Sequence, residues 1–86
     1  MRFNGKVVSK NGSETIVKGD YQIKTTPGGL TGWSGSFPLP GSKHIGVGDY
    51  QLVLDDGRSA YILILRVSAS SGRATVAEFR GNGPPP

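Results

Sequence analysis

Apolar and polar side chains alternate one by one over several stretches of this chain, and Gly or Pro interrupts almost every segment between them. Successive side chains of a β-strand point to opposite faces, so a period of two predicts strands with one buried face. A helix needs apolar residues at i, i+3, i+4 and i+7, and no segment keeps that spacing. The sequence therefore predicts an all-β fold with essentially no helix.

The alternation predicts six strands, which cover residues 2–8, 15–25, 32–37, 49–55, 58–67 and 73–80. In the first four of these strands, one set of alternating positions is mostly apolar or Gly, and we expect this set to point inward. Its members are Phe3, Gly5, Val7, Val17, Gly19, Tyr21, Ile23, Trp33, Gly35, Phe37, Tyr50, Leu52 and Leu54.

Short turn signals separate the strands. Asn11-Gly12 predicts a hairpin with a type I′ turn, in which both central residues have positive φ, and Asp56-Gly57 predicts a second hairpin. Further turn sequences occupy residues 26–29 and 70–72, and the longest irregular stretch covers residues 38–48. Tight turns between successive strands favour a meander, in which neighbours in the sequence are neighbours in the sheet.

Six strands with one apolar face each must close or fold over to bury that face and protect their edges. We therefore expect a small antiparallel six-stranded barrel or roll, with Gly5, Gly19 and Gly35 at its bends. SH3-like, OB-like and PilZ-like barrels all fit this pattern, and no residue motif selects among them. Residues 1–80 form the single predicted domain. Residues 81–86 form a Gly/Pro-rich tail, because consecutive prolines cannot continue a sheet.

The composition removes several classes of site. The chain of 86 residues has no Cys and one His, His44, which excludes disulfides, thiolate chemistry and multi-His metal centres. Asp49, Asp55 and Asp56 could suggest a cation site, but Asp55 and Asp56 flank a predicted turn, where Asp is common, and no further acidic cluster completes a calcium loop. Neither residues 32–36 nor residues 46–51 complete a nucleophile or dinucleotide motif. We expect no catalytic, cofactor or metal site, and hence no enzyme.

We expect neither a secretory signal nor a membrane span in this sequence. Its N-terminal residues lack an apolar core segment, and its longest apolar run, 60–65, is far shorter than the roughly 20 residues that cross a bilayer. We expect a cytoplasmic protein without membrane contact, and Met1 suggests a native N-terminus.

The segment 60–67 is apolar on both faces until Arg66, whereas an antiparallel strand with one wet face should alternate. Tyr61, Leu63, Leu65 and Val67 form one face. A second copy of the chain, in a symmetric homodimer, would cover the apolar face that the core does not. The other possible covers are the segment 38–48 and the proline tail. The expected interface consists of Tyr61, Ile62, Leu63, Ile64, Leu65 and Val53.

A basic face on the first hairpin supports an alternative function. Arg2, Lys6, Lys18 and Lys24 all point outward, and the chain has a net charge of +4 with a pI near 9.8. Such a face could follow a nucleic-acid backbone. Bases also need exposed aromatic rings, however, and the aromatic residues here are assigned inward. A solvated surface is the simpler interpretation.

The irregular stretch 38–48 is a further candidate, because binding residues concentrate on loops held by a rigid scaffold. Trp33 and Phe37 lead into this stretch, and Lys43 and His44 lie within it. These four residues could line a ligand pocket for a sugar or a peptide. Taken together, the sequence predicts a non-enzymatic binding module that binds protein and self-associates, with a nucleic-acid-binding barrel as the alternative.

Overall fold

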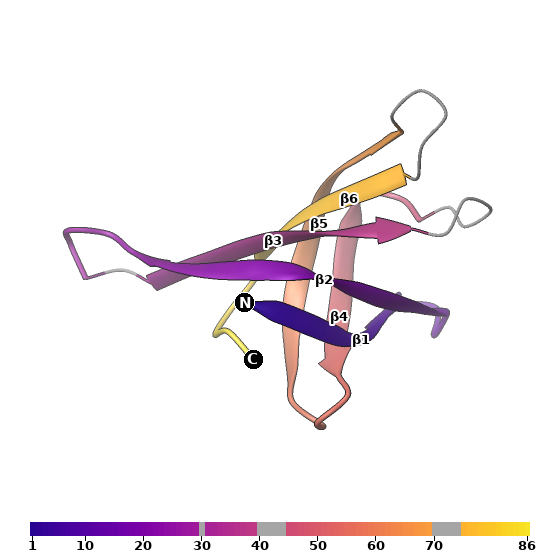
Figure 1. Ribbon diagram of the computed structural model, residues 1–86, viewed down its shortest axis with the longest axis horizontal. Coiled ribbons are helices and arrows are strands. Elements are labelled where there is room, and N and C mark those ends of the chain that lie inside the picture. The colour runs from indigo at the N-terminus through magenta and orange to yellow at the C-terminus, as the bar shows by residue number, and fades with distance from the viewer. Residues whose placement is uncertain (30, 40–44, 70–74) are drawn as a thin grey trace.

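Hydrogen bonds between neighbouring strands close this computed structural model into a barrel, which is described over residues 1–29, 31–39, 45–69 and 75–86. The strands are β1 (Arg2–Val8), β2 (Glu14–Thr25), β3 (Thr31–Leu39), β4 (Gly48–Leu54), β5 (Ser59–Ala69) and β6 (Thr75–Gly81). All six neighbouring pairs are antiparallel (Figure 1). Over these described residues, the predicted all-β, six-stranded barrel without helix is confirmed.

The strand order is β1-β2-β3-β6-β5-β4, and β4 closes the barrel by pairing with β1. The meander is therefore wrong at one connection, since β3 lies beside β6 and not beside β4. Strands β4, β5 and β6 lie side by side in chain order. Strand β3, which precedes them in the chain, pairs with the free edge of β6, and this is a Greek-key arrangement. Turn signals report only on local pairs, whereas β3–β6 and β1–β4 are non-local pairs.

Three hairpins have the same turn, and it differs from the predicted type I′. In each, a glycine N–H donates to the carbonyl three residues earlier: Gly12 to Ser9, Gly29 to Thr26, and Gly57 to Leu54. Only the glycine has a positive φ, because no non-glycine residue of the described chain does. These are type I turns followed by a left-handed glycine, the common three-residue hairpin loop. The hairpins at Asn11-Gly12 and Asp56-Gly57 are confirmed, but Asn11 does not take the positive φ of a type I′ turn.

The barrel interior holds one hydrophobic core. Its members are Phe3, Val7, Val17, Tyr21, Trp33, Phe37, Leu39, Leu52, Leu54, Ala60, Ile62, Ile64, Ala77 and Phe79. Four of its rings form a closed cycle, with centroid separations of 6.0 Å for Phe3–Tyr21, 5.9 Å for Tyr21–Trp33, 5.9 Å for Trp33–Phe79 and 6.2 Å for Phe79–Phe3. Such tilted and edge-to-face pairs add stability beyond simple burial.

Close backbone approach explains one inward glycine. A Cβ on Gly35 would collide with the backbone oxygen of Asp20 and lie 2.8 Å from the ring of Phe79. Any larger residue would push β3 away from β2 or displace the ring. The inward position of Gly35 that the alternation predicts is thus enforced by packing.

The β2–β3 hairpin continues beyond the barrel as a two-stranded arm, described over residues 22–29 and 31–33, at the left of Figure 1. The β1–β2 ladder ends at Asp20, and the β3–β6 ladder begins at Ser34, so neither neighbour accompanies the arm. Ile23, which we expected inside, is exposed because no core lies under this part of β2. Alternation gives the face of a side chain but does not show whether anything covers that face.

Strand β3 is longer than expected at its other end. It continues through Pro38 to Leu39, and the Leu39 side chain is buried in the core. The β2–β3 ladder ends at Ser36, so Pro38 is paired with β6 alone. Proline is tolerated in a strand at such half-paired positions, which is why it did not end this one.

The C-terminal tail returns to the barrel and packs at the base of the arm. Strand β6 includes Gly81, one residue into the predicted tail, and the N–H of Asn82 donates to the carbonyl of Tyr61. The indole Nε1 of Trp33 donates to the carbonyl of Gly83 at 2.9 Å. The tail thereby caps the sole tryptophan.

Candidate docking surface on the outer face of β5

A β-bulge in β5 decides which of its apolar side chains face water. The β5–β6 register shifts between Ile64 and Arg66, so Leu65 is an extra residue. A bulge places two successive residues of one strand opposite one residue of its partner. Leu65 and Arg66 are both exposed, and Val67 returns to the core side. The charge that interrupts the apolar pattern at Arg66 is the sequence signal of this bulge.

The barrel core itself covers one of the two apolar faces of β5. We expected Ile62 and Ile64 at an interface, but they are 0% and 1% exposed and belong to the core. Val67 is wrongly grouped with Tyr61, since it packs against the core. The sequence could not reveal this, because the closure of the barrel decides which face becomes the interior.

The opposite face of β5 is apolar and open to solvent. Tyr61 is 62% exposed and Leu65 is 53% exposed, while Leu63 between them is half-buried. Val53 on β4 is also half-buried and faces outward, but it lies opposite Ser59 and not opposite any of these three residues. We call Tyr61, Leu63 and Leu65 the β5 outer face. The tail contacts this strand through the backbone of Tyr61 and leaves the Tyr61 ring exposed.

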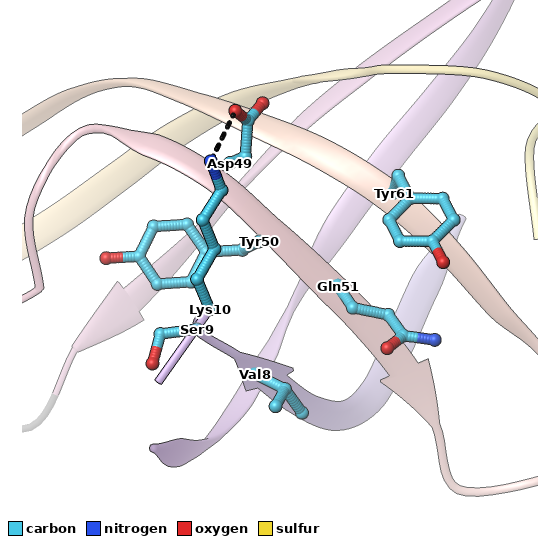
Figure 2. Close-up of a pocket in the computed structure, with 7 residues that line it drawn as sticks. All are labelled: Val8, Ser9, Lys10, Asp49, Tyr50, Gln51 and Tyr61. Carbon is cyan, nitrogen blue, oxygen red and sulfur yellow. Dashed lines mark ion pairs between the residues drawn. The ribbon is translucent and has the colours of Figure 1, made fainter. Parts of the chain in front are cut away.

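A hollow of about 200 Å³ adjoins the β5 outer face. Val8, Gln51 and Tyr61 stand opposite one another on β1, β4 and β5. Figure 2 shows the seven residues that line the hollow: Val8, Ser9, Lys10, Asp49, Tyr50, Gln51 and Tyr61. Its volume suits one large side chain and lies below the range typical of drug-sized ligands, about 300–1,000 Å³.

The rim of the hollow carries one charge of each sign. Lys10 Nζ lies 3.7 Å from Asp49 Oδ2, and both side chains are exposed. The hydroxyl of Tyr50 donates to the carbonyl of Gly46 at 3.0 Å, which fixes the ring that forms one wall. None of Val8, Lys10, Asp49, Tyr50 and Gln51 was a predicted site residue. They come together only through the non-local β1–β4 pairing.

The four predicted basic residues do not form one stripe. Arg2 lies 4.0 Å from Asp20, and Lys6 makes a 2.7 Å ion pair with Glu14. Lys18 and Lys24 have no ion pair with any residue that the structure describes. Six residues of extended strand separate these two lysines, about 20 Å. Half of the predicted basic charge is thus paired on the same surface.

The predicted ligand loop is corrected at two positions. Trp33 and Phe37 are buried in the aromatic core, so they cannot line a pocket mouth. Their rings fill the interior because alternation on β3 points both inward, as the strand prediction itself required. Lys43 and His44 lie outside the described residues.

Within residues 1–29, 31–39, 45–69 and 75–86, no three His, Asp or Glu side chains gather as a metal-ligand set. The N–H of Arg58 donates to Asp56 at 3.0 Å and its Nε donates at 2.7 Å, and these hydrogen bonds lower the pKa of the Asp56 carboxyl. Asp56 is therefore a turn residue, as its position in the sequence predicts. No helix in the same ranges is long and apolar enough to cross a membrane.

Comparison with known proteins identifies no relative. No family model, no curated protein and no solved structure matches this chain. The functional argument therefore rests on the geometry of the chain itself.

Proposed function

We propose that this protein is a non-enzymatic binding module that docks protein partners, including a second copy of itself, through the β5 outer face. The supporting observation is the exposure of Tyr61 and Leu65 on a strand whose other face already fills the core. These two side chains are not needed to complete the barrel. Burying them against a partner would remove apolar surface from water, at roughly 25 cal/mol per Å².

The adjoining hollow strengthens this proposal. Protein interfaces gain most of their affinity from a few anchors, commonly aromatic, that fill pockets at the centre of the contact. An exposed tyrosine beside a hollow of about 200 Å³ provides both halves of such an anchor. Lys10 and Asp49 supply a polar rim around it.

Nucleic-acid binding has less support. Two of the four predicted cations are paired with Asp20 and Glu14, and counterion release requires charges that can approach phosphates. The aromatic residues on β1, β2 and β3 are buried, so that side of the barrel presents no ring for base stacking.

Self-association is tested by measuring molar mass with sedimentation velocity from low to high micromolar concentration. We expect the mass to rise with concentration from the 9.0 kDa of one chain. Leu65→Glu and Tyr61→Arg should each abolish this rise, because each places a charge in the apolar contact.

Ile16→Glu is the matched control. Ile16 is 79% exposed on β2, and β1 and β4 separate it from β5. This variant should associate like the parent chain. A parent chain that keeps the mass of one chain at high micromolar concentration would contradict self-association, and an equal loss in Ile16→Glu would contradict the choice of surface.

A further inference from the structure

We infer that the edge of β2 that faces β3, at Ile16 and Lys18, binds an extended acidic peptide as an added strand. We call this edge the β2 edge. Strands β1 and β4 separate it from β5 on one side of the barrel, and β3 and β6 on the other, so the inference does not rest on the β5 outer face. In such recognition, hydrogen bonds along the main chain supply affinity and alternate side chains supply specificity.

The backbone groups of β2 point alternately toward β1 and toward β3. Tyr21 exchanges hydrogen bonds of 2.8 Å and 2.7 Å with Met1, so its N–H and C=O face β1. The β1–β2 register has no shift along the whole ladder. Val17 therefore bonds to β1 as Tyr21 does, and the N–H and C=O groups of Ile16 and Lys18 face β3.

Strand β3 offers the β2 edge no partner. The β2–β3 ladder stops at the pair Asp20 and Ser36, and the two strands move apart beyond this point (Figure 1). The next hydrogen-bonded position in the same register places Pro38 opposite Lys18, and proline has no N–H to donate. Within the described residues, the β2 edge is therefore unpaired. Such a row of backbone groups is a template for another strand.

A groove of about 380 Å³ lies between the two strands where they separate. Ile16, Val17, Lys18, Pro38 and Leu39 line it. Val17 and Leu39 are core residues, whereas Ile16 is 79% exposed and Pro38 is also exposed. The volume falls in the range typical of ligand sites, about 300–1,000 Å³. An added strand would bring apolar side chains against this lining.

Lys18 determines the charge of the peptide. Its side chain is exposed and has no ion pair with any residue in the described part of the chain. The acids on the same strand have other partners, since Glu14 lies 2.7 Å from Lys6 and Asp20 lies 4.0 Å from Arg2. A carboxylate opposite Lys18 on the added strand would form a cross-strand pair of opposite charge. The edge therefore favours an acidic peptide.

Amide hydrogen exchange, followed by NMR, tests the edge in the free chain. We expect the N–H groups of Ile16 and Lys18 to exchange about tenfold or more faster than that of Val17, which bonds to β1. Exchange of all three at the same slow rate would show that the β2 edge is already covered, and this result would overturn the inference.

The probe is a short acetylated and amidated peptide of about seven residues, a common strand length. It carries valine at every odd position, glutamate at the centre and threonine at the other even positions. We expect saturable binding by fluorescence anisotropy, and slower exchange at Ile16 and Lys18 in the complex. The same peptide N-methylated at its glutamate and threonines cannot donate to the β2 edge and should bind about tenfold or more weakly. Equal binding of both peptides would contradict strand addition.

Charge reversal tests the role of Lys18. Lys18→Glu should weaken binding of the glutamate peptide about tenfold and restore binding of a peptide with lysine at its centre. Lys24→Glu is the matched control, because Lys24 is exposed on the same strand but lies on the arm, and it should bind like the parent. Tyr61→Arg should also bind like the parent, which separates this site from the β5 outer face. Equal losses in Lys18→Glu and Lys24→Glu would overturn the assignment of the site.

Discussion

The outer faces of β5 and of the β1–β2 pair have the same geometry and different chemistry. Each presents every second side chain of a strand to solvent. On β1 and β2, Arg2 and Lys6 meet acidic partners on the same surface. On β5, Tyr61 and Leu65 project without cover. The charged face is satisfied by its own chain and by water, whereas the apolar face gains from a partner.

The first test compares an inward and an outward residue of β5, and we expect it to show the largest change in the free energy of unfolding. Ile62→Ala removes a side chain that is 0% exposed and leaves a cavity, so we expect a loss of about 2–5 kcal/mol in the free energy of unfolding. Tyr61→Ala, at the adjacent outward position, should lower the free energy of unfolding by much less than Ile62→Ala, because the Tyr61 ring contributes little to the core. Urea denaturation at low protein concentration, where the chain is a single copy, measures both. Equal losses would show that Tyr61 is part of the fold rather than of a docking surface.

The second test concerns the charges of the β1–β2 face. We expect labelled single-stranded RNA or DNA to bind weakly and only at low salt, through Lys18 and Lys24. Replacing both lysines with Gln should reduce the slope of log affinity against log salt by about 1.5–2. Arg2→Gln with Lys6→Gln is the matched control and should change the slope less, since those cations are paired with acids. Fluorescence anisotropy gives the slopes, and a larger effect in the control pair would reverse this ranking of the lysines.

The third test examines a charged pair at the end of the β4–β5 hairpin and should have the smallest effect. The backbone N–H and the side chain of Arg58 hold the pKa of Asp56 below its ordinary value. Such a carboxyl stabilises the fold above its unfolded pKa and loses that contribution as the pH falls through its folded pKa. Arg58→Ala should raise the pKa of Asp56, seen by NMR titration, and leave self-association unchanged. An unchanged pKa would show that the side chain of Arg58 does not contribute.

Much of the fold could be predicted from the sequence because its signals are local. Alternation identified all six strands, and Asn11-Gly12 and Asp56-Gly57 identified two hairpins. The type I′ turn predicted from Asn11-Gly12 is wrong, since Gly12 is the residue with positive φ in this loop and Asn11 is not. The prediction that β3 ends before Pro38 is wrong. Proline fits in a strand where one neighbour is absent, and the β2–β3 ladder stops at Ser36.

The candidate site was only partly accessible from the sequence, because it depends on closure and register. The apolar character of segment 60–67 was visible, but whether Ile62 or Tyr61 faces inward depends on the barrel. The hollow was invisible, since Val8 and Gln51 meet through a pairing between strands more than 40 residues apart in the chain. Arg66 is the local sign of the bulge in the sequence, because it places a charge where the apolar pattern would otherwise continue.

The hydrogen bond from Trp33 to Gly83 has a practical consequence for the experiments above. Trp33 is the sole tryptophan, and it lies between the core rings and the C-terminal tail. Its intrinsic fluorescence is therefore a built-in reporter of the integrity of the barrel and of the seating of the tail. The tail that accepts this hydrogen bond is also bonded to the backbone of Tyr61 through Asn82, so a change in emission when two copies meet would report a shift of the tail. A variant with altered mass and unaltered emission has changed its association and kept its fold.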